Sequence, residues 1–251
     1  MPNRWVVILV CLILIAACAP APTPSPTPQV ARIVTTSAFE STAAEWAATF
    51  AFGQQSVLME IDIMTPQAAL KAIDAGEADV IIAGVKPPQG WFASPLWVEG
   101  IAVVVHPSNS ARRLSTDDLI SIFAGRITTW SELKGENWAI QPIVPFSGDD
   151  LRAQFETQVL NDAPVTPNAL LAPNPSAMAS MVAVDEGAIG ILPFSYITPE
   201  VLTVIVDGII PTVSNLQNGL YPLSIEVLAL APEEPVGVAR DWLAWMQSLL
   251  P

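Results

Sequence analysis

One histidine and two cysteines limit the chemistry available to this chain of 251 residues. Cys11 and Cys18 both lie near the N-terminus, so the sequence beyond them offers no thiol nucleophile and no disulfide. A Ser-His-Asp triad would depend on His106, which precedes Pro107 at the end of a strand-like run and which we interpret as a connector residue. These features argue against a Cys-His enzyme and a His-rich zinc site. The sequence therefore predicts no catalytic residue, no metal, no cofactor and no enzyme activity.

Cys18 has a context that is typical of bacterial export. Residues 1–4 form a short basic start, and residues 5–17 form an apolar run with small residues just before Cys18. That run is shorter than the ~20 residues that a membrane-spanning helix needs. The arrangement resembles a signal peptide that ends in a lipobox, where the cysteine thiol is acylated; the alternative is a buried N-terminal helix. We predict a signal peptide over residues 1–17, lipidation of Cys18, and a location on the outer face of the cytoplasmic membrane, extracytoplasmic or periplasmic.

The segment that follows is typical of a spacer. Residues 18–30 contain alternating prolines between positions 20 and 28. Proline lacks a backbone donor and favours extended polyproline II, at ~3.1 Å per residue. We therefore expect a Pro/Thr-rich tether that holds the rest of the chain away from the membrane.

The charge of the chain excludes one class of partner. Lys and Arg number 10 against 24 Asp and Glu, which gives a formal net charge of −14. A field of this sign does not attract nucleic acid or an anionic lipid surface. We predict no nucleic-acid partner, and any site for an anion must be built locally.

Strand-like and helix-like patterns alternate along residues 31–251, which predicts an α/β fold. The expected strands lie within 32–35, 57–63, 79–83, 101–105, 140–144, 188–192 and 225–231. The expected helices lie within 39–53, 65–76, 115–125, 149–160, 176–186 and 236–249. These elements must position whatever site the chain carries.

Four segments resemble signatures of one family. Residues 119–133 hold Ile-Phe-Ala-Gly-Arg and a later Trp, residues 185–191 end in Gly-Ala-Ile-Gly-Ile, residues 218–224 read Asn-Gly-Leu-Tyr-Pro-Leu-Ser, and residues 239–246 form a Trp-containing helix. Together they resemble the phosphate-binding proteins of bacterial phosphate ABC importers. The resemblance implies a two-lobe, type II periplasmic-binding-protein-like fold, with mixed sheets flanked by helices and hinge crossover strands.

The same resemblance implies a domain plan and a function. Lobe I would comprise residues 31–105 and 207–251, and lobe II residues 106–206. The protein would be an extracytoplasmic solute-binding lipoprotein that captures an oxyanion such as phosphate and delivers it to an ABC permease. The alternative is a surface-anchored ligand-sensing or interaction module with the same fold and no phosphate binding.

The resemblance also indicates where the ligand would lie. Free N–H groups and the dipole at a helix N-terminus favour an anion. The sequence Thr35-Thr36-Ser37-Ala38 resembles the first phosphate loop of the family, and an ordinary helix cap is the alternative. Thr65 opens a second helix, where Pro66 removes one backbone donor. Thr65 is therefore either a ligand contact or a plain cap.

The third opening departs from the family pattern of an Arg followed by Ser-Gly-Thr. Here Ser147 and Gly148 are followed by Asp149 and Asp150, and no Arg precedes them. A carboxylate ~4 Å from a bound phosphate would repel it by about 4 kcal/mol at an effective dielectric constant of 20. Lys86 could supply a substitute cation, or it could be a solvated loop lysine. As a further alternative, the two acids could bind a cationic or hydroxyl-rich ligand.

Overall fold

The computed structural model describes residues 28–54, 56–161 and 163–249, so the predicted signal peptide, Cys18 and most of the tether lie outside the described residues. The strands are β1 (Gln29–Thr35), β2 (Val57–Ile63), β3 (Val80–Ala83), β4 (Phe92–Val105), β5 (Arg113–Leu114), β6 (Gln141–Pro145), β7 (Leu170–Ala172), β8 (Ala188–Pro193), β9 (Leu202–Thr203), β10 (Ile205–Val206) and β11 (Ser224–Ala231). The helices are α2 (Glu40–Ala51), α3 (Pro66–Asp74), α4 (Thr116–Phe123), α5 (Asp150–Phe155), α6 (Pro175–Val184), α7 (Val213–Gln217) and α8 (Gly237–Leu249). Short helical turns are η1 (Trp130–Leu133), η2 (Glu156–Leu160) and η3 (Phe194–Tyr196).

One mixed sheet forms the frame of the molecule, with the strand order β2-β1-β3-β11-β4-β8-β6-β7 and with β9 paired to β4. β1 runs parallel to β2 and β3, whereas β11 is antiparallel to β3 and β4. Further along, β4 is antiparallel to β8, and β6 is parallel to both β8 and β7. The predicted α/β fold with a mixed sheet and flanking helices is confirmed.

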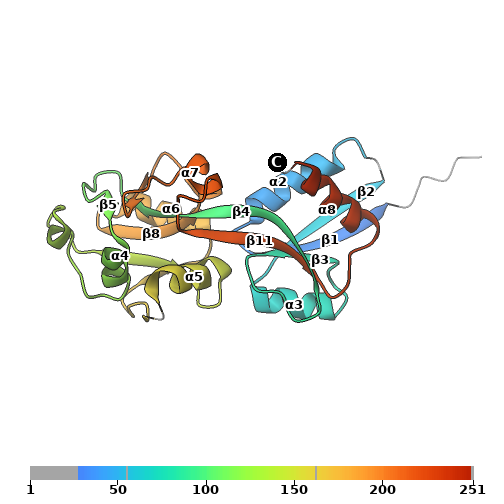
Figure 1. Cartoon of the computed structure of the whole chain (residues 1–251), viewed down its shortest axis with the longest axis horizontal. Coiled ribbons are helices and arrows are strands. Elements are labelled where there is room, and N and C mark those ends of the chain that lie inside the picture. Colours follow the sequence, from blue (N-terminus) through green and yellow to red (C-terminus); the bar gives the residue numbers. More distant parts are fainter. Residues whose placement is uncertain (1–27, 55, 162, 250–251) are drawn as a thin grey trace, which may run out of the picture.

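The strands β4 and β11 connect two halves of the molecule (Figure 1). β4 pairs with β11 over Phe92–Gly100 and with β8 over Ile101–Val105, so one strand serves both halves. At the change of partner, a Cβ on Gly100 would lie 2.6 Å from the ring of Phe194, so the close approach requires glycine. The first half contains β1–β3 with α2, α3 and α8, and the second contains β6–β8 with α4, α5 and α6 (Figure 1).

The return of the chain to the first half takes place in β11. Figure 1 shows α7 beside the second half, and the Tyr221 hydroxyl donates to the Ile101 carbonyl at 2.9 Å. The sequence prediction placed residues 207–251 together in lobe I, whereas α7 and Tyr221 lie beside the second half. The division of the chain into lobes at residues 106 and 207 stays a prediction. The position of α7 favours β11 as the strand in which the chain returns to the first half.

Local sequence signals explain where the site-bearing helices begin. The Thr65 hydroxyl accepts a hydrogen bond from Ala68 N, and Pro66 occupies the first turn of α3, as expected for a capped start. Ser115 and Asp118 form a reciprocal capping box at α4. The helix expected over 149–160 is divided into α5 and the π-helical turn η2. Of the helices in the described residues, none combines the length and apolar character of a bilayer-spanning segment.

Candidate functional site

The turn after β1 presents hydroxyl groups to the opposite half of the molecule. Thr35 and Thr36 are both buried, but their side chains have different partners. The Thr35 hydroxyl donates to the Ile82 carbonyl at 3.1 Å, within the first half. The Thr36 hydroxyl donates to Asp150 Oδ2 at 2.9 Å, and the Ser37 hydroxyl donates to Asp149 Oδ2 at 3.4 Å. Thr36 and Ser37 therefore face the second half, whereas Thr35 joins two strands.

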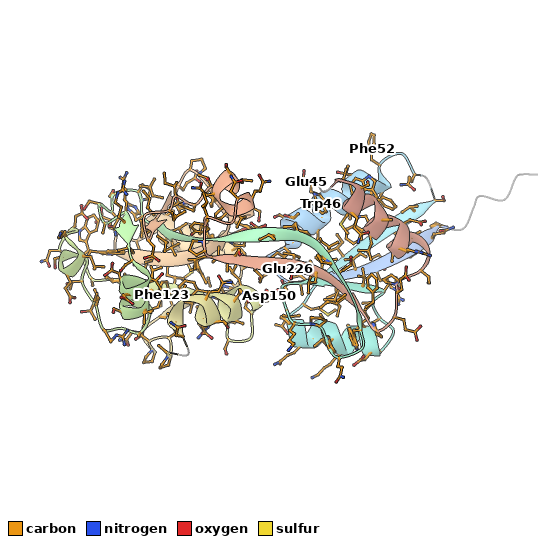
Figure 2. The ribbon with its side chains drawn as sticks, in the orientation of Figure 1. Glu45, Trp46, Phe52, Phe123, Asp150 and Glu226 are labelled. Atoms are coloured by element: carbon orange, nitrogen blue, oxygen red, sulfur yellow. The ribbon has the colours of Figure 1, made fainter. Side chains whose placement is uncertain are left out.

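The two acids stand where α5 begins. Asp149 is its N-cap, and its Oδ1 accepts a hydrogen bond from Arg152 N at 3.2 Å. Asp150 follows, and its Oδ2 also accepts the backbone N–H of Gly84 at 3.0 Å. Figure 2 shows Asp150 at the end of α5 that faces the first half. The carboxylate of Asp150 thus joins donors from two separate loops of the first half.

Burial controls the ionisation of both acids. Asp150 is 1% exposed, and burial raises its pKa, against the opposing effect of hydrogen bonds from Gly84 and Thr36. Burial, followed by the negative charge of Asp150, raises the pKa of Asp149 to about 6. The two carboxylates therefore share a poorly hydrated junction, where the charge of Asp150 disfavours ionisation of Asp149.

A cavity of about 210 Å³ lies beside this junction and has walls from both halves. Its lining polar side chains are Thr36, Ser37, Thr65, Ser147 and Asp149, and its apolar part includes Met64 and Phe146. Among these described lining residues there is no Lys or Arg. The cavity is therefore lined by four hydroxyl side chains and one carboxyl, and the hydroxyls of Thr36 and Ser37 already donate to Asp150 and Asp149.

The structure brings together five of the residues predicted to bind ligand: Thr36, Ser37, Thr65, Ser147 and Asp149. Ala38 is buried beside Asp149 in a narrow crevice that adjoins the cavity. Gly148 is exposed and has a φ of 90°, which suits a turn that favours glycine. Ligand contact at all these positions stays a prediction.

Two of the predicted residues lie apart from the cavity. Lys86 is exposed in the loop after β3 and is not among the residues that line the cavity. Thr35 is committed to Ile82. Arg152, inside α5, also points elsewhere, since it donates to Glu156 at 2.7 Å and to the Pro145 carbonyl at 2.9 Å. No described cation therefore replaces the family arginine at the cavity wall.

Gly84 is a site residue that the sequence prediction missed. Its N–H donates to Asp150, and a Cβ at this position would collide with the Ile225 side chain and lie 3.3 Å from Phe39. The signal that could have found it is a glycine directly after the buried strand β3, where the backbone approaches a neighbour closely.

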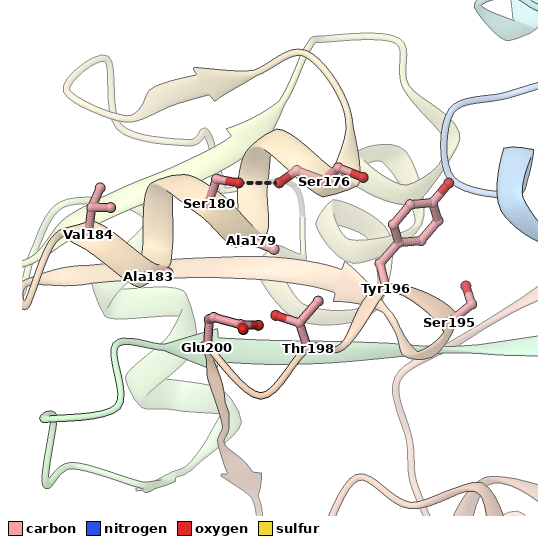
Figure 3. Close-up of a pocket in the computed structure, with 9 residues that line it drawn as sticks. All are labelled: Ser176, Ala179, Ser180, Ala183, Val184, Ser195, Tyr196, Thr198 and Glu200. Atoms are coloured by element: carbon pink, nitrogen blue, oxygen red, sulfur yellow. Dashed lines mark hydrogen bonds between the residues drawn. The ribbon is translucent and has the colours of Figure 1, made fainter.

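A second contact between the halves involves Tyr196, at one end of a groove of about 520 Å³ (Figure 3). The Tyr196 hydroxyl donates to the Ser37 carbonyl at 3.3 Å and accepts from Ser41 N at 3.2 Å. The groove continues along α6, past the hydroxyls of Ser176 and Ser180. Tyr196 therefore supports the same turn that carries Thr36 and Ser37.

His106 is held by a local hydrogen bond. His106 Nδ1 accepts a hydrogen bond from Ser108 N at 3.1 Å, which fits a connector histidine. Within residues 28–54, 56–161 and 163–249, no cluster of three or more His, Cys, Asp or Glu side chains could hold a metal. The arrangement is suited to holding a solute by hydrogen bonds.

Comparison with known proteins agrees with this geometry. Residues 21–248 match the family model of a PBP superfamily domain. The chain belongs to the PBP superfamily. This PBP superfamily chain is 30% identical to the phosphate-binding protein PstS of Bacillus subtilis (strain 168) over 152 residues, which are 60% of the chain and 50% of that protein. The chain thus matches half the length of this relative, and the family resemblance seen in the sequence is confirmed.

Two solved structures show the same fold. A phosphate ABC transporter substrate-binding protein from Clostridium perfringens, with bound phosphate, is 24% identical, with a TM-score of 0.81 over 87% of this chain and 92% of that chain. An ABC-type phosphate transport receptor from Vibrio cholerae is 19% identical, with a TM-score of 0.70 over 86% and 93%. The PBP superfamily chain therefore shares the fold of substrate-binding proteins, a family that is not one of enzymes.

Proposed function

We propose that this chain is a lipid-anchored substrate-binding protein that captures a small solute between its halves and delivers it to an ABC permease. The observation that supports this most is the cavity of about 210 Å³, lined by hydroxyls from the first half and by Ser147 and Asp149 from the second. A solute held there contacts both halves at once. It stabilises the closed arrangement by binding it more tightly than an open one.

Phosphate is the leading candidate for the solute. The hydroxyls of Thr65 and Ser147 can donate to phosphate oxygens, and the carboxyl of Asp149 can share a proton with a protonated phosphate. The hydroxyls of Thr36 and Ser37 can donate once they release the carboxylates of Asp150 and Asp149. Both named relatives with known structures are phosphate transport proteins. Binding requires no covalent step, so the protein acts by capture and release.

A melting experiment tests this ligand class. The chain, purified from membranes in detergent, is melted with phosphate, sulfate, molybdate, amino acids or sugars. A true ligand at ~100 times its dissociation constant adds about 2.7 kcal/mol to the free energy of unfolding. We expect phosphate to raise the melting temperature. A shift with an amino acid or a sugar, and none with any oxyanion, would replace phosphate with another ligand class.

The proposed anchor is Cys18, after a signal peptide over residues 1–17, with residues 18–30 as the tether on the outer face of the cytoplasmic membrane. Cys18→Ser removes the thiol that would carry the acyl chains. We expect the variant to leave the membrane fraction and to lose incorporation of labelled palmitate, which Cys11→Ser retains. Retention of label by Cys18→Ser would rule out this anchor.

A ligand-sensing or interaction module without phosphate binding is the second candidate. The observation that favours it is that Asp149 and Asp150 place two carboxylates at the junction, where the hydroxyl of Thr36 and the N–H of Gly84 already have an acceptor. If this candidate is correct, deletion of the chain leaves phosphate uptake unchanged in cells that depend on phosphate uptake for growth. For the transport proposal, deletion lowers uptake.

A further inference from the structure

The carboxylate of Asp150 is held like a bound oxyanion. Its Oδ2 accepts the Thr36 hydroxyl at 2.9 Å and the Gly84 N–H at 3.0 Å. Its Oδ1 accepts the Leu151 N–H at 3.1 Å. A hydroxyl and backbone N–H groups are the donors that anion sites in proteins commonly use. We call Thr36 Oγ1 and Gly84 N the oxyanion seat.

The positions of these donors separate the seat from an ordinary helix cap. Thr36 and Gly84 belong to two loops of the first half, whereas Asp150 belongs to α5 in the second half. Gly84 has no room for a side chain, because a Cβ would collide with Ile225. The backbone of Gly84 thus packs directly against the Ile225 side chain. A carboxylate from one half therefore fills a seat that the other half builds.

Among the described residues, no cation forms an ion pair with Asp150. Its polar partners in the described residues are the hydroxyl of Thr36 and backbone N–H groups, and its neighbour Asp149 carries a further carboxyl. Burial of an unpaired charge destabilises a protein, so buried acids are usually paired with a cation. Hydrogen bonds to a charged acceptor are shorter and stronger than neutral ones, so the seat suits an anion.

We propose that Asp150 is a built-in anion that occupies the oxyanion seat of Thr36 and Gly84, joins the two halves, and competes with an external oxyanion such as phosphate. This inference rests on the proposed solute-binding function and specifies its selectivity. An external oxyanion enters the seat when the carboxylate leaves it. Asp150 thus sets how tightly oxyanions bind.

Removal of the carboxylate tests the proposal. In Asp150→Ser the side chain is short and neutral, so the seat becomes free. We expect titration calorimetry of the chain in detergent, near pH 7.5, to show phosphate binding at least tenfold tighter than in the wild type. Asp117→Ser is the matched control, because Asp117 is an exposed acid in the first turn of α4, away from the cavity. It should bind phosphate as the wild type does.

Two further variants locate the effect. Thr36→Val in the Asp150→Ser background removes one donor of the seat, and the gain in affinity should be lost. Asp150→Asn removes the charge but keeps the shape, so its gain should be smaller than that of Asp150→Ser. Where Asp150→Ser does not fold, Asp150→Asn decides: tighter phosphate binding than in the wild type supports the built-in anion, and equal binding overturns it.

The outcomes separate this inference from the proposed function. A folded Asp150→Ser variant that binds phosphate no more tightly than the wild type overturns the built-in anion, whether or not the wild type binds phosphate. A gain that persists with Thr36→Val also overturns it, because the phosphate then lies elsewhere. Binding by Asp150→Ser and none by the wild type supports the inference and removes phosphate as the natural ligand.

Discussion

Two helices of the second half begin with acidic residues, but the carboxylates have different partners. At α4, Asp118 accepts hydrogen bonds from the backbone N–H and hydroxyl of Ser115, at 2.8 and 2.7 Å. Ser115 is three positions away, so this arrangement is local. At α5, Asp150 accepts hydrogen bonds from Thr36 and Gly84, which are 114 and 66 positions away. Asp118 therefore caps its own helix, whereas Asp150 joins the two halves of the molecule.

The difference lies in where the donors come from. Asp118 is partly exposed, so water can replace a lost partner, whereas Asp150 is 1% exposed. Burial makes an unpaired acid costly, so Asp150 depends on donors that only the folded molecule supplies. An acid at a helix start therefore becomes part of a site when distant loops reach it.

The largest expected contrast between the two helix starts is their response to pH. Burial raises the pKa of Asp149 from its usual 3.8 to about 6. Between these values the unfolded chain binds fewer protons than the folded protein, so the free energy of unfolding falls as the pH rises through the window. The loss is about 3 kcal/mol, at ~1.4 kcal/mol per pKa unit, and is complete above about pH 6. Asp150, with a pKa raised in the same direction, adds to it.

Asp149→Asn should recover up to about 3 kcal/mol near pH 7.5, because asparagine caps a helix as well as aspartate does. Urea unfolding between about pH 4 and about pH 8 measures the effect. Asp118→Asn is the matched control at α4. It removes a carboxylate from a local capping box and should destabilise the protein by about 1 kcal/mol. If both variants changed the free energy of unfolding in the same direction, the proposed difference between the two helix starts would be wrong.

The next effect concerns the hydroxyls of two adjacent threonines. Thr36→Val removes a donor to a buried carboxylate, and hydrogen bonds to charged groups contribute about 1.5–3 kcal/mol. Thr35→Val is the control, because its hydroxyl donates to the neutral carbonyl of Ile82, at a cost of about 1 kcal/mol. We expect urea unfolding to show the larger loss for Thr36→Val. A larger loss for Thr35→Val would mean that Asp150 does not depend on Thr36.

Gly84→Ala tests the backbone donor. The added Cβ would collide with the Ile225 side chain, and overpacking of this kind costs about 1–3 kcal/mol. Ile225→Val in the same chain removes the Cδ1 atom that lies nearest to the new methyl group, so it should restore part of the stability. Thermal unfolding of the two single variants and the double variant measures this coupling. If the stability losses of the two single variants simply add in the double variant, the effect of Gly84→Ala does not come from contact with Ile225.

Periodicity and caps predicted the elements that surround the site. β2 has the predicted bounds, and α3 and α4 begin at the expected Thr65 and Ser115 caps. The sequence prediction missed residues 92–100 of β4, because Pro95 argues against a strand there. It also missed the short α7, whose five residues are too few for helical periodicity to show.

The site was less predictable, because its key contact joins distant residues. The resemblance indicated Thr36, Ser37 and Asp149, and the structure places all three at one cavity. The sequence identified Asp150 as an acid at a helix start, but not its bond to Thr36, because no local pattern reports a contact across 114 positions. The sequence also did not predict which way each side chain points. Thr35 and Thr36 are neighbours, yet the Thr35 hydroxyl bonds to its own sheet and the Thr36 hydroxyl bonds to the opposite half.

The smallest expected effect belongs to Lys86, the cation that the sequence suggested as a substitute for the missing arginine. Its side chain is exposed and is not part of the cavity wall, so its charge is screened by water and salt. Lys86→Ala should change the free energy of unfolding by no more than about 0.5 kcal/mol. Phosphate affinity should also stay at the wild-type value in titration calorimetry, both in the natural chain and in Asp150→Ser. A tenfold weaker affinity in Lys86→Ala would show that the loop after β3 brings this cation to the ligand, and the site would then hold its anion by a charge as well as by the donors of Thr36 and Gly84.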